Sequence, residues 1–157
     1  MPRDRGLAEA LLSTSALRPR VQPGIQALKD VDRKHIERGA RGLFEDSLAL
    51  DSALEDSSIR ENRWDYLLSE RGIRSMVAIE VHNATGKDVD RMIRKKEWAL
   101  RILPLHFRDQ ARVRRWFWIA SGKTGLTAGT TEYKRMIKAG LRLVGGMLLR
   151  KHLAESD

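Results

Sequence analysis

The sequence predicts an α/β domain in which a small mixed β-sheet is flanked by helices. Three observations support this fold class: two neighbouring segments alternate apolar and polar residues, a long amphipathic segment follows them, and shorter strand-like and helix-like segments come after it. With 157 residues, the chain fits one domain. We expect residues 1–24, which hold three of the four prolines, to form an extension outside the core, and residues 25–157 to form the domain.

The other elements are predicted from apolar spacing and from glycine and proline. Residues 32–54 show helical spacing of apolar side chains and lead into a polar loop or frayed helix end over residues 51–62. Residues 87–103 form the clearest helix, which Pro104 is expected to stop. The later segments are a strand at 115–120, a glycine- and threonine-rich loop at 121–130, a helix at 131–139 and a strand at 141–149.

Two segments between these helices, residues 63–70 and 73–84, are predicted to form a β-hairpin with Gly72 in its turn. In the second strand, three aliphatic residues alternate with Ala78, Glu80 and His82, so Glu80 and His82 share one face of the sheet. An acid buried in the middle of a strand is costly unless something compensates it. A divalent metal bridging Glu80 to Asp65, on the first strand, would compensate it.

This order of elements, with an acid on each hairpin strand, resembles the PD-(D/E)xK nuclease superfamily over residues 32–149. The resemblance implies a restriction-endonuclease-like fold, with Asp65 and Glu80 as metal-binding carboxylates and the backbone carbonyl of Val81 as a further ligand. It also implies Mg²⁺ or Mn²⁺ as the cofactor and attack of water on a phosphodiester. His82 stands where the family motif has lysine.

The missing lysine leaves two interpretations open. Some members of the superfamily carry the lysine on the following helix, and Lys96 is the candidate because it falls within the apolar stripe, whereas Lys95 faces more outward. Alternatively, the enzyme is inactive, or His82 acts as the acid or base. Structural roles are open as well: Glu80 and His82 on a solvated face, Asp65 paired with an arginine, and Lys96 extending its stem to water.

The charge of the chain favours a polyanionic partner. A formal net charge of +9 and a pI of about 10.3 indicate nucleic acid first and an acidic membrane surface second. The basic residues expected to contact nucleic acid are Arg91, Arg94, Lys95, Arg112, Arg114, Arg115 and Lys123. Trp116 and Trp118 share one face of a predicted strand, where core packing is favoured over base stacking.

Several classes of protein are disfavoured by composition. There is no cysteine, which excludes disulfides and thiol nucleophiles and fits a cytoplasmic protein. No apolar run reaches the roughly 18 residues of a membrane span. Residues 121–124 read Ser-Gly-Lys-Thr, but Phe117 stands where a phosphate-binding loop needs its first glycine, so nucleotide binding is disfavoured.

The sequence therefore predicts a metal-dependent phosphodiesterase of the endonuclease type that acts on nucleic acid, with DNA favoured. The alternative is a catalytically inactive protein of the same fold that serves as a nucleic-acid-binding or protein-interaction module. A homodimer or a protein partner is left open by the sequence.

Overall fold

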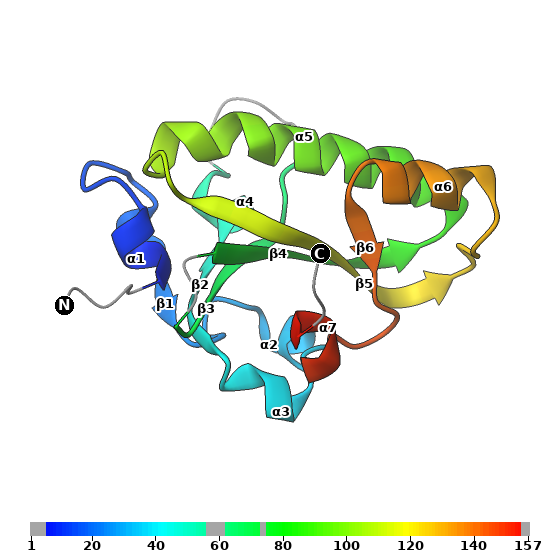
Figure 1. Cartoon of the computed structure of the whole chain (residues 1–157), viewed down its shortest axis with the longest axis horizontal. Coiled ribbons are helices and arrows are strands. Elements are labelled where there is room, and N and C mark those ends of the chain that lie inside the picture. Colours follow the sequence, from blue (N-terminus) through cyan, green and yellow to red (C-terminus); the bar gives the residue numbers. More distant parts are fainter. Residues whose placement is uncertain (1–5, 56–61, 73–74, 155–157) are drawn as a thin grey trace.

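Six strands form one mixed sheet with helices on both faces, which confirms the predicted α/β class (Figure 1). The structure is a computed structural model that describes residues 6–55, 62–72 and 75–154. The strands follow chain order across the sheet: β1 (Gln22–Pro23), β2 (Phe44–Ala49), β3 (Tyr66–Glu70), β4 (Ser75–Ala84), β5 (Arg112–Thr124) and β6 (Leu141–Leu143). Strands β1 to β4 pair antiparallel with one another, whereas β5 pairs parallel with both β4 and β6.

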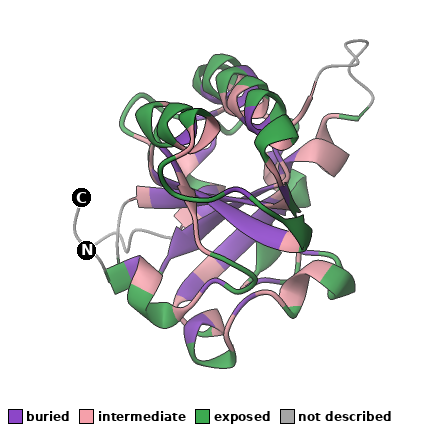
Figure 2. Cartoon of the chain, turned by 90° about the vertical axis from the view of Figure 1, so that its right-hand side faces the viewer, coloured by how far each residue is buried: buried purple, intermediate pink, exposed green. Residues whose placement is uncertain are grey.

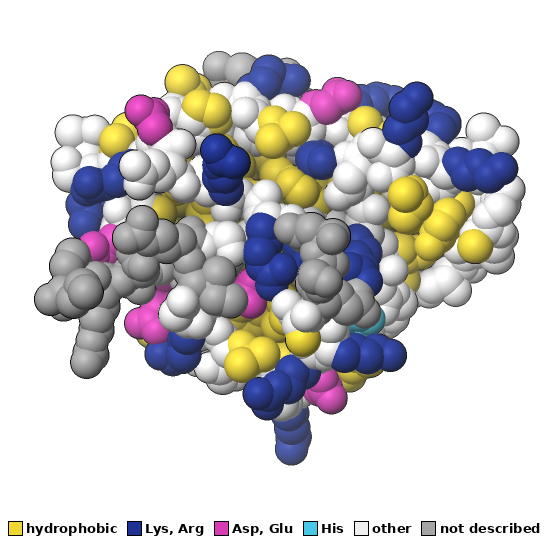
Figure 3. All heavy atoms as spheres, in the orientation of Figure 1, with side chains coloured by type: hydrophobic (Ala, Val, Ile, Leu, Met, Phe, Trp, Pro, Cys, Tyr) yellow, Lys and Arg dark blue, Asp and Glu magenta, His cyan; other side chains and the backbone are white. Residues whose placement is uncertain are grey.

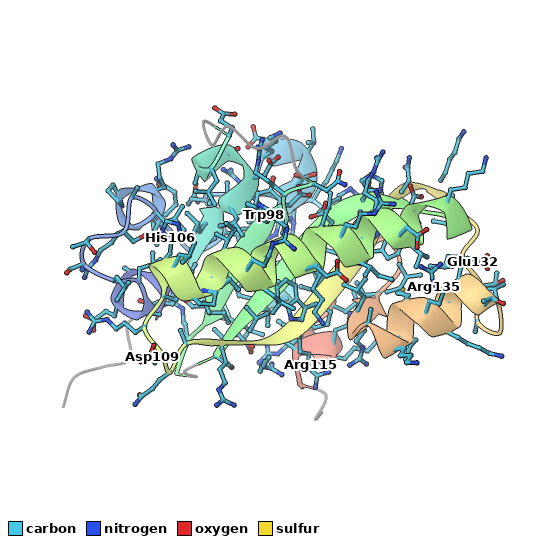
Figure 4. All side chains as sticks on the ribbon, turned by 90° about the horizontal axis from the view of Figure 1, so that it is seen from above. Trp98, His106, Asp109, Arg115, Glu132 and Arg135 are labelled. Atoms are coloured by element: carbon cyan, nitrogen blue, oxygen red, sulfur yellow. The ribbon has the colours of Figure 1, made fainter. Side chains whose placement is uncertain are left out.

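The longest helix, α5 (Val89–His106), crosses one face of the sheet, and α6 (Thr131–Lys138) lies beside its N-terminal half (Figures 1 and 4). Short helices cover the opposite face: α2 (Asp30–Arg33), α3 (Arg38–Arg41) and α7 (Arg150–Ala154). The remaining turns of helix are α1 (Gly6–Ala10), α4 (Leu50–Ala53), η1 (Arg18–Arg20) and η2 (Gly86–Asp88). Within the described residues, no helix has the length and apolar character needed to cross a membrane.

The sheet separates two apolar clusters, because successive side chains of a strand point to opposite faces. Ala78 and Trp116 belong to the cluster beneath α5, whereas Val77 and Phe117 belong to the cluster beneath α2, α3 and α7. Figure 2 shows this as a layer of buried strands between helices that are exposed on their outer sides. Trp118 is also completely buried beneath α5, so the aromatic strand packs in the core as expected.

The N-terminal segment belongs to the core. The prediction of an extension over residues 1–24 is wrong for residues 6–24, whereas residues 1–5 lie outside the described part of the chain. Three side chains of this segment are completely buried in the cluster beneath α5: Leu7, Leu11 and Leu17. The buried carboxylate of Asp46 also accepts a hydrogen bond from the backbone N–H of Leu7 at 2.9 Å. Burial of these apolar side chains and this hydrogen bond stabilise the segment against the sheet, although its prolines suggested an extension.

Residues 32–54 do not form the single helix that their apolar spacing predicts. They form the end of α2, then α3, β2 and α4. Strand β2 lies between β1 and β3 and is buried on both faces, so its residues Phe44, Asp46, Ser47 and Leu48 show no simple alternation. A strand buried on both faces cannot be recognised by a period of two, and the apolar spacing fits a helix by coincidence.

The predicted hairpin and the two later helices are confirmed, with shifted ends. Helix α5 continues through Pro104 to His106. The missing N–H of Pro104 leaves the carbonyl of Leu100 without its helical partner, and this half-exposed turn allows water to replace it. Strand β5 extends through Thr124 into the predicted loop, and β6 ends at Leu143, six residues earlier than expected.

Candidate active site

Asp65 and Glu80 lie opposite each other at one end of the β3–β4 hairpin, on the face covered by α5. The ladder pairs Tyr66 with Ile79, so Asp65 and Glu80 are the next residues in register. The backbone N–H of Asp65 donates to Oε2 of Glu80 at 2.8 Å. The N–H of Val81 donates to Oδ2 of Asp65 at 3.3 Å. Backbone hydrogen bonds of the hairpin thus hold both carboxylates in place.

Lys95, from α5, reaches the same place. Its Nζ contacts Oε1 of Glu80. The side chain of Lys95 is 13% exposed, and that of Glu80 is completely buried. Asp65, Glu80 and Lys95 therefore form a cluster of charged side chains that come from β4, from α5 and from the residue just before β3. We call it the acid–lysine cluster.

Lys96 does not face the acids, and the prediction that it would do so in preference to Lys95 is wrong. Its Nζ donates to the backbone carbonyl of Ala139 at 2.6 Å and lies 5.3 Å from the ring centroid of Trp116. Burial lowers the pKa of Lys96. The two acids lie beneath one edge of the apolar stripe of α5, and Lys95, at that edge, reaches Glu80. Buried residues three and four positions after Lys95 were the signal in the sequence that it also faces the sheet.

His82 stands two residues after Glu80 on the same strand, but its polar contacts lie elsewhere. Its Nδ1 is 3.0 Å from the carbonyl oxygen of Asn83 and 3.8 Å from Oδ1 of Asp88. Asp88 in turn forms a capping box with Thr85 at the start of η2, which leads into α5. Within the described residues, the ring of His82 thus contacts Asn83 and Asp88 and not the acid pair.

The electrostatics of the acid pair follow from its burial. Burial raises the pKa of Glu80 to about 8, and the charge of Asp65 adds to this against the opposing effect of Lys95. The pKa of Asp65 is also raised, because the effect of burial exceeds the opposing effects of Lys95 and of the hydrogen bond from the N–H of Val81. The two carboxyls interact, so the titration of each depends on the charge of the other. The ammonium of Lys95 offsets their negative charge.

The donor set of the cluster fits a hard divalent cation. Mg²⁺ prefers oxygen ligands, and in nucleotide-processing sites it is held by one or two carboxylates together with waters and substrate phosphates. Two carboxylates on neighbouring strands satisfy that requirement. No group of three or more acidic, histidine or cysteine side chains suited to a metal occurs within the described residues. Val81 contacts Asp65 through its N–H, and the carbonyl of Val81 stays a predicted ligand.

The basic residues of α5 near the cluster are open to solvent. Arg91 and Arg94 are exposed on the N-terminal half of the helix that carries Lys95. Figure 3 shows that Lys and Arg side chains are spread over one whole face of the molecule and do not gather in a single patch. The third predicted contact on α5, Lys95, is itself part of the acid–lysine cluster, and Arg91 and Arg94 precede it by four residues and one residue.

The predicted basic contacts around β5 differ in availability. Arg112 and Lys123 are exposed at the two ends of the strand. Arg114 donates to Oε1 of Glu70 at 2.9 Å and to the backbone carbonyl of Leu153 at 2.8 Å. Arg115 is buried. The prediction that Arg114 and Arg115 bind nucleic acid does not agree with these positions, because a paired or buried guanidinium is not presented to a phosphate.

A cavity of about 660 Å³ lies away from the acid pair, beside the C-terminal end of α5. Its walls come from α1, the start of β4 and the residues around Phe107, and include Gly6, Met76 and Pro104. Figure 4 looks down on α5 and shows His106 and Asp109 at this end, far along the helix from Arg135 and Glu132 of α6. This cavity is therefore separate from the acid–lysine cluster.

The fold and the site together define a mixed α/β protein with an Asp–Glu–Lys cluster, built around the completely buried Glu80, on the face of its sheet that the longest helix covers. Comparisons with protein-family models, with curated proteins and with solved structures found no match to this chain.

Proposed function

We propose that this chain is a metal-dependent phosphodiesterase of the endonuclease type that acts on nucleic acid. The observation that carries the proposal is the acid–lysine cluster, in which two carboxyls and an ammonium meet on one face of the sheet. Burial of charged groups costs free energy, and groups with shifted pKa values cluster at functional sites. The cluster supplies the two types of group that phosphodiester hydrolysis needs, oxygen ligands for a cation and a positive charge for the phosphate.

Each residue of the cluster has a role in this proposal. Asp65 and Glu80 would hold Mg²⁺ or Mn²⁺, which polarises a phosphoryl oxygen and favours ionisation of a bound water. Lys95 would stabilise the negative charge that develops on the phosphate in the transition state. His82 is given no catalytic role, because its contacts connect it to the start of α5. The restriction-endonuclease-like fold is part of the same proposal, supported by an antiparallel hairpin that leads through α5 to a parallel strand.

Nucleic acid is the proposed substrate because of charge. The chain carries a formal net charge of +9, and Arg91 and Arg94 are exposed on the helix that carries Lys95. Phosphate contacts of this kind supply affinity without depending on base sequence. DNA is favoured over RNA as the substrate.

Cleavage by the purified protein tests the proposal. Single- and double-stranded DNA and RNA would be incubated with the protein in Mg²⁺, in Mn²⁺ and in EDTA. We expect metal-dependent cleavage that Glu80→Gln and Asp65→Asn abolish and that Glu97→Gln, an exposed acid on α5, leaves unchanged. Circular dichroism would confirm that the variants fold. If the wild type cleaves none of the four substrates with either metal, the proposal of phosphodiesterase activity is refuted.

A second candidate function is a catalytically inactive nucleic-acid-binding module on the same scaffold. The observation that favours it is that Lys95 already provides a counter-ion for Glu80, so the buried acids are compensated without a metal. In that case the cluster stabilises the fold, and nucleic-acid binding requires no divalent cation. Titration calorimetry with Mn²⁺ separates the two candidates, because a module of this kind would show no saturable heat.

A further inference from the structure

The two oxygens of Glu80 have different kinds of partner. Oε2 accepts a hydrogen bond from the backbone N–H of Asp65, whereas Oε1 contacts the side-chain ammonium of Lys95. The first partner is fixed by the hairpin and cannot leave without breaking the end of the ladder. The second is the end of a flexible four-carbon stem. Of the two contacts, only the one with Lys95 can be exchanged at small cost.

We propose that Lys95 and a divalent cation compete for Glu80, so that the lysine serves as the counter-ion of the acid pair until a metal binds. This inference rests on the proposed function, because it takes the acid pair as a metal site. It goes beyond that function by giving Lys95 a role before catalysis, as the residue that makes the fold independent of metal. The same lysine then lowers the affinity of the site for the metal.

The position of Lys95 supports an exchange of this kind. Its side chain is 13% exposed, so the ammonium is covered but lies near solvent, whereas Glu80 is completely buried. Arg91, one turn before Lys95 on α5, is exposed, so solvent lies close to this side of the helix. An ammonium and a divalent cation that share one carboxylate repel each other, and the repulsion is strong where water is excluded.

Lys96 provides a matched control. It lies on the same helix and carries the same charge, but its ammonium is engaged by the carbonyl of Ala139 and the ring of Trp116. It does not contact Glu80. Removal of its charge therefore affects packing between α5 and α6 without changing the contacts of the acid pair.

Titration with the metal alone tests the competition. Mn²⁺ and Mg²⁺ would be titrated by calorimetry into the wild type, Lys95→Met, Lys96→Met and Glu80→Gln in the absence of nucleic acid. We expect Lys95→Met to bind metal at least about fivefold more tightly than the wild type, as is usual for two coupled ligands. Lys96→Met should bind with wild-type affinity, and Glu80→Gln should lose most of its affinity. If Lys95→Met binds metal with equal or lower affinity than the wild type, the competition is refuted, but the proposed metal site is not.

Thermal unfolding provides a second measurement that does not depend on calorimetric heat. In EDTA, Lys95→Met should melt at a lower temperature than the wild type, and saturating Mn²⁺ should raise its Tm by more than it raises that of the wild type. If Lys95→Met does not fold in EDTA, Lys95→Gln, which keeps a hydrogen-bond donor without the charge, is used for both measurements. If neither the wild type nor these variants bind Mn²⁺ or Mg²⁺, the competition and the proposed function both fail.

Discussion

Lys95 and Lys96 are consecutive residues of α5, yet their ammonium groups reach different parts of the fold. Lys95 contacts Glu80 of β4, and Lys96 donates to the carbonyl of Ala139 just after α6. Consecutive residues of a helix point about 100° apart, so a helix that lies across a sheet can direct adjacent side chains to different neighbours. This divergence decides which lysine is available to the acids.

The first prediction uses this divergence to assign the lysine of the reaction. Lys95→Met should reduce the rate of metal-dependent cleavage by a factor on the order of 10² to 10³, because it removes a charge directed at the phosphate. Lys96→Met should retain most of the wild-type rate. Single-turnover cleavage at saturating metal measures both variants without the effect of metal affinity. An equal loss in the two variants would show that the assignment to Lys95 is wrong.

The second prediction concerns stability and pH in the absence of metal. The pKa of Glu80 in the folded protein is raised to about 8 from an ordinary value of 4.5, so the folded state binds the proton more tightly than the unfolded state. This stabilisation is complete below the ordinary value and is lost as pH rises through about 8. The free energy of unfolding should therefore fall with rising pH, by at most about 1.4 kcal/mol per pH unit from this group.

Urea unfolding in EDTA at intervals from pH 5 to pH 9 measures this dependence. Burial lowers the pKa of His106 and His152, and both act in the opposite direction near their titration. The difference between the wild type and Glu80→Gln removes their contribution. That difference should decrease with rising pH; a constant difference would contradict the raised pKa of Glu80.

The third prediction tests the attachment of the N-terminal segment. Gly6 has a φ of +70°, and a Cβ on it would lie 2.5 Å from Oγ of Ser69 and 2.7 Å from Oδ1 of Asp46. Gly6→Ala should therefore lower the free energy of unfolding by about 1–3 kcal/mol, as overpacking usually does. Gly24→Ala is the control, since Gly24 has a φ of +55° but no atom within 4 Å of such a Cβ. Chemical denaturation should show the larger loss for Gly6→Ala, and similar losses would exclude the close contact.

The fourth prediction identifies the surface that holds nucleic acid. A double substitution, Arg91→Gln with Arg94→Gln, should weaken binding to duplex DNA of any sequence and make the dependence of log K on log salt less steep by about 0.9 for each lost contact. Lys134→Gln with Lys138→Gln removes the same charge from exposed positions of α6 and is the control. Fluorescence anisotropy in EDTA measures binding without cleavage. If both pairs of substitutions have the same effect, binding depends on net charge and not on α5.

Local signals in the sequence were sufficient to locate the hairpin and its acids. Alternation in β4 and a glycine in the turn are properties of neighbouring residues, so they predicted that Asp65 and Glu80 share one face. Strand β2 was misassigned because burial on both faces removes alternation and leaves apolar residues that also fit a helix. Its recognition requires knowledge of the strands on either side, which no local window contains.

The choice between Lys95 and Lys96 depended on tertiary placement. The apolar stripe of α5 indicated which side of the helix faces the sheet, and both lysines border it. The stripe does not show which strand lies under which flank. That relationship follows from the parallel crossover between β4 and β5, which sets α5 over the sheet with Glu80 at one flank and Trp116 at the other. The partner of a lysine at the edge of the stripe can therefore be predicted only when the topology of the sheet is known.

The core beneath α5 contains all four tryptophans of the chain: Trp64, Trp98, Trp116 and Trp118. The rings of Trp64 and Trp116 meet edge to face, with their centroids 5.0 Å apart. Tryptophan fluorescence of the native protein therefore comes wholly from shielded indoles within one cluster, without a background from surface tryptophan. Separation of α5 from the sheet would expose these rings to water together and shift their emission to longer wavelength. The chain thus carries its own optical reporter for the seating of the helix that bears Lys95.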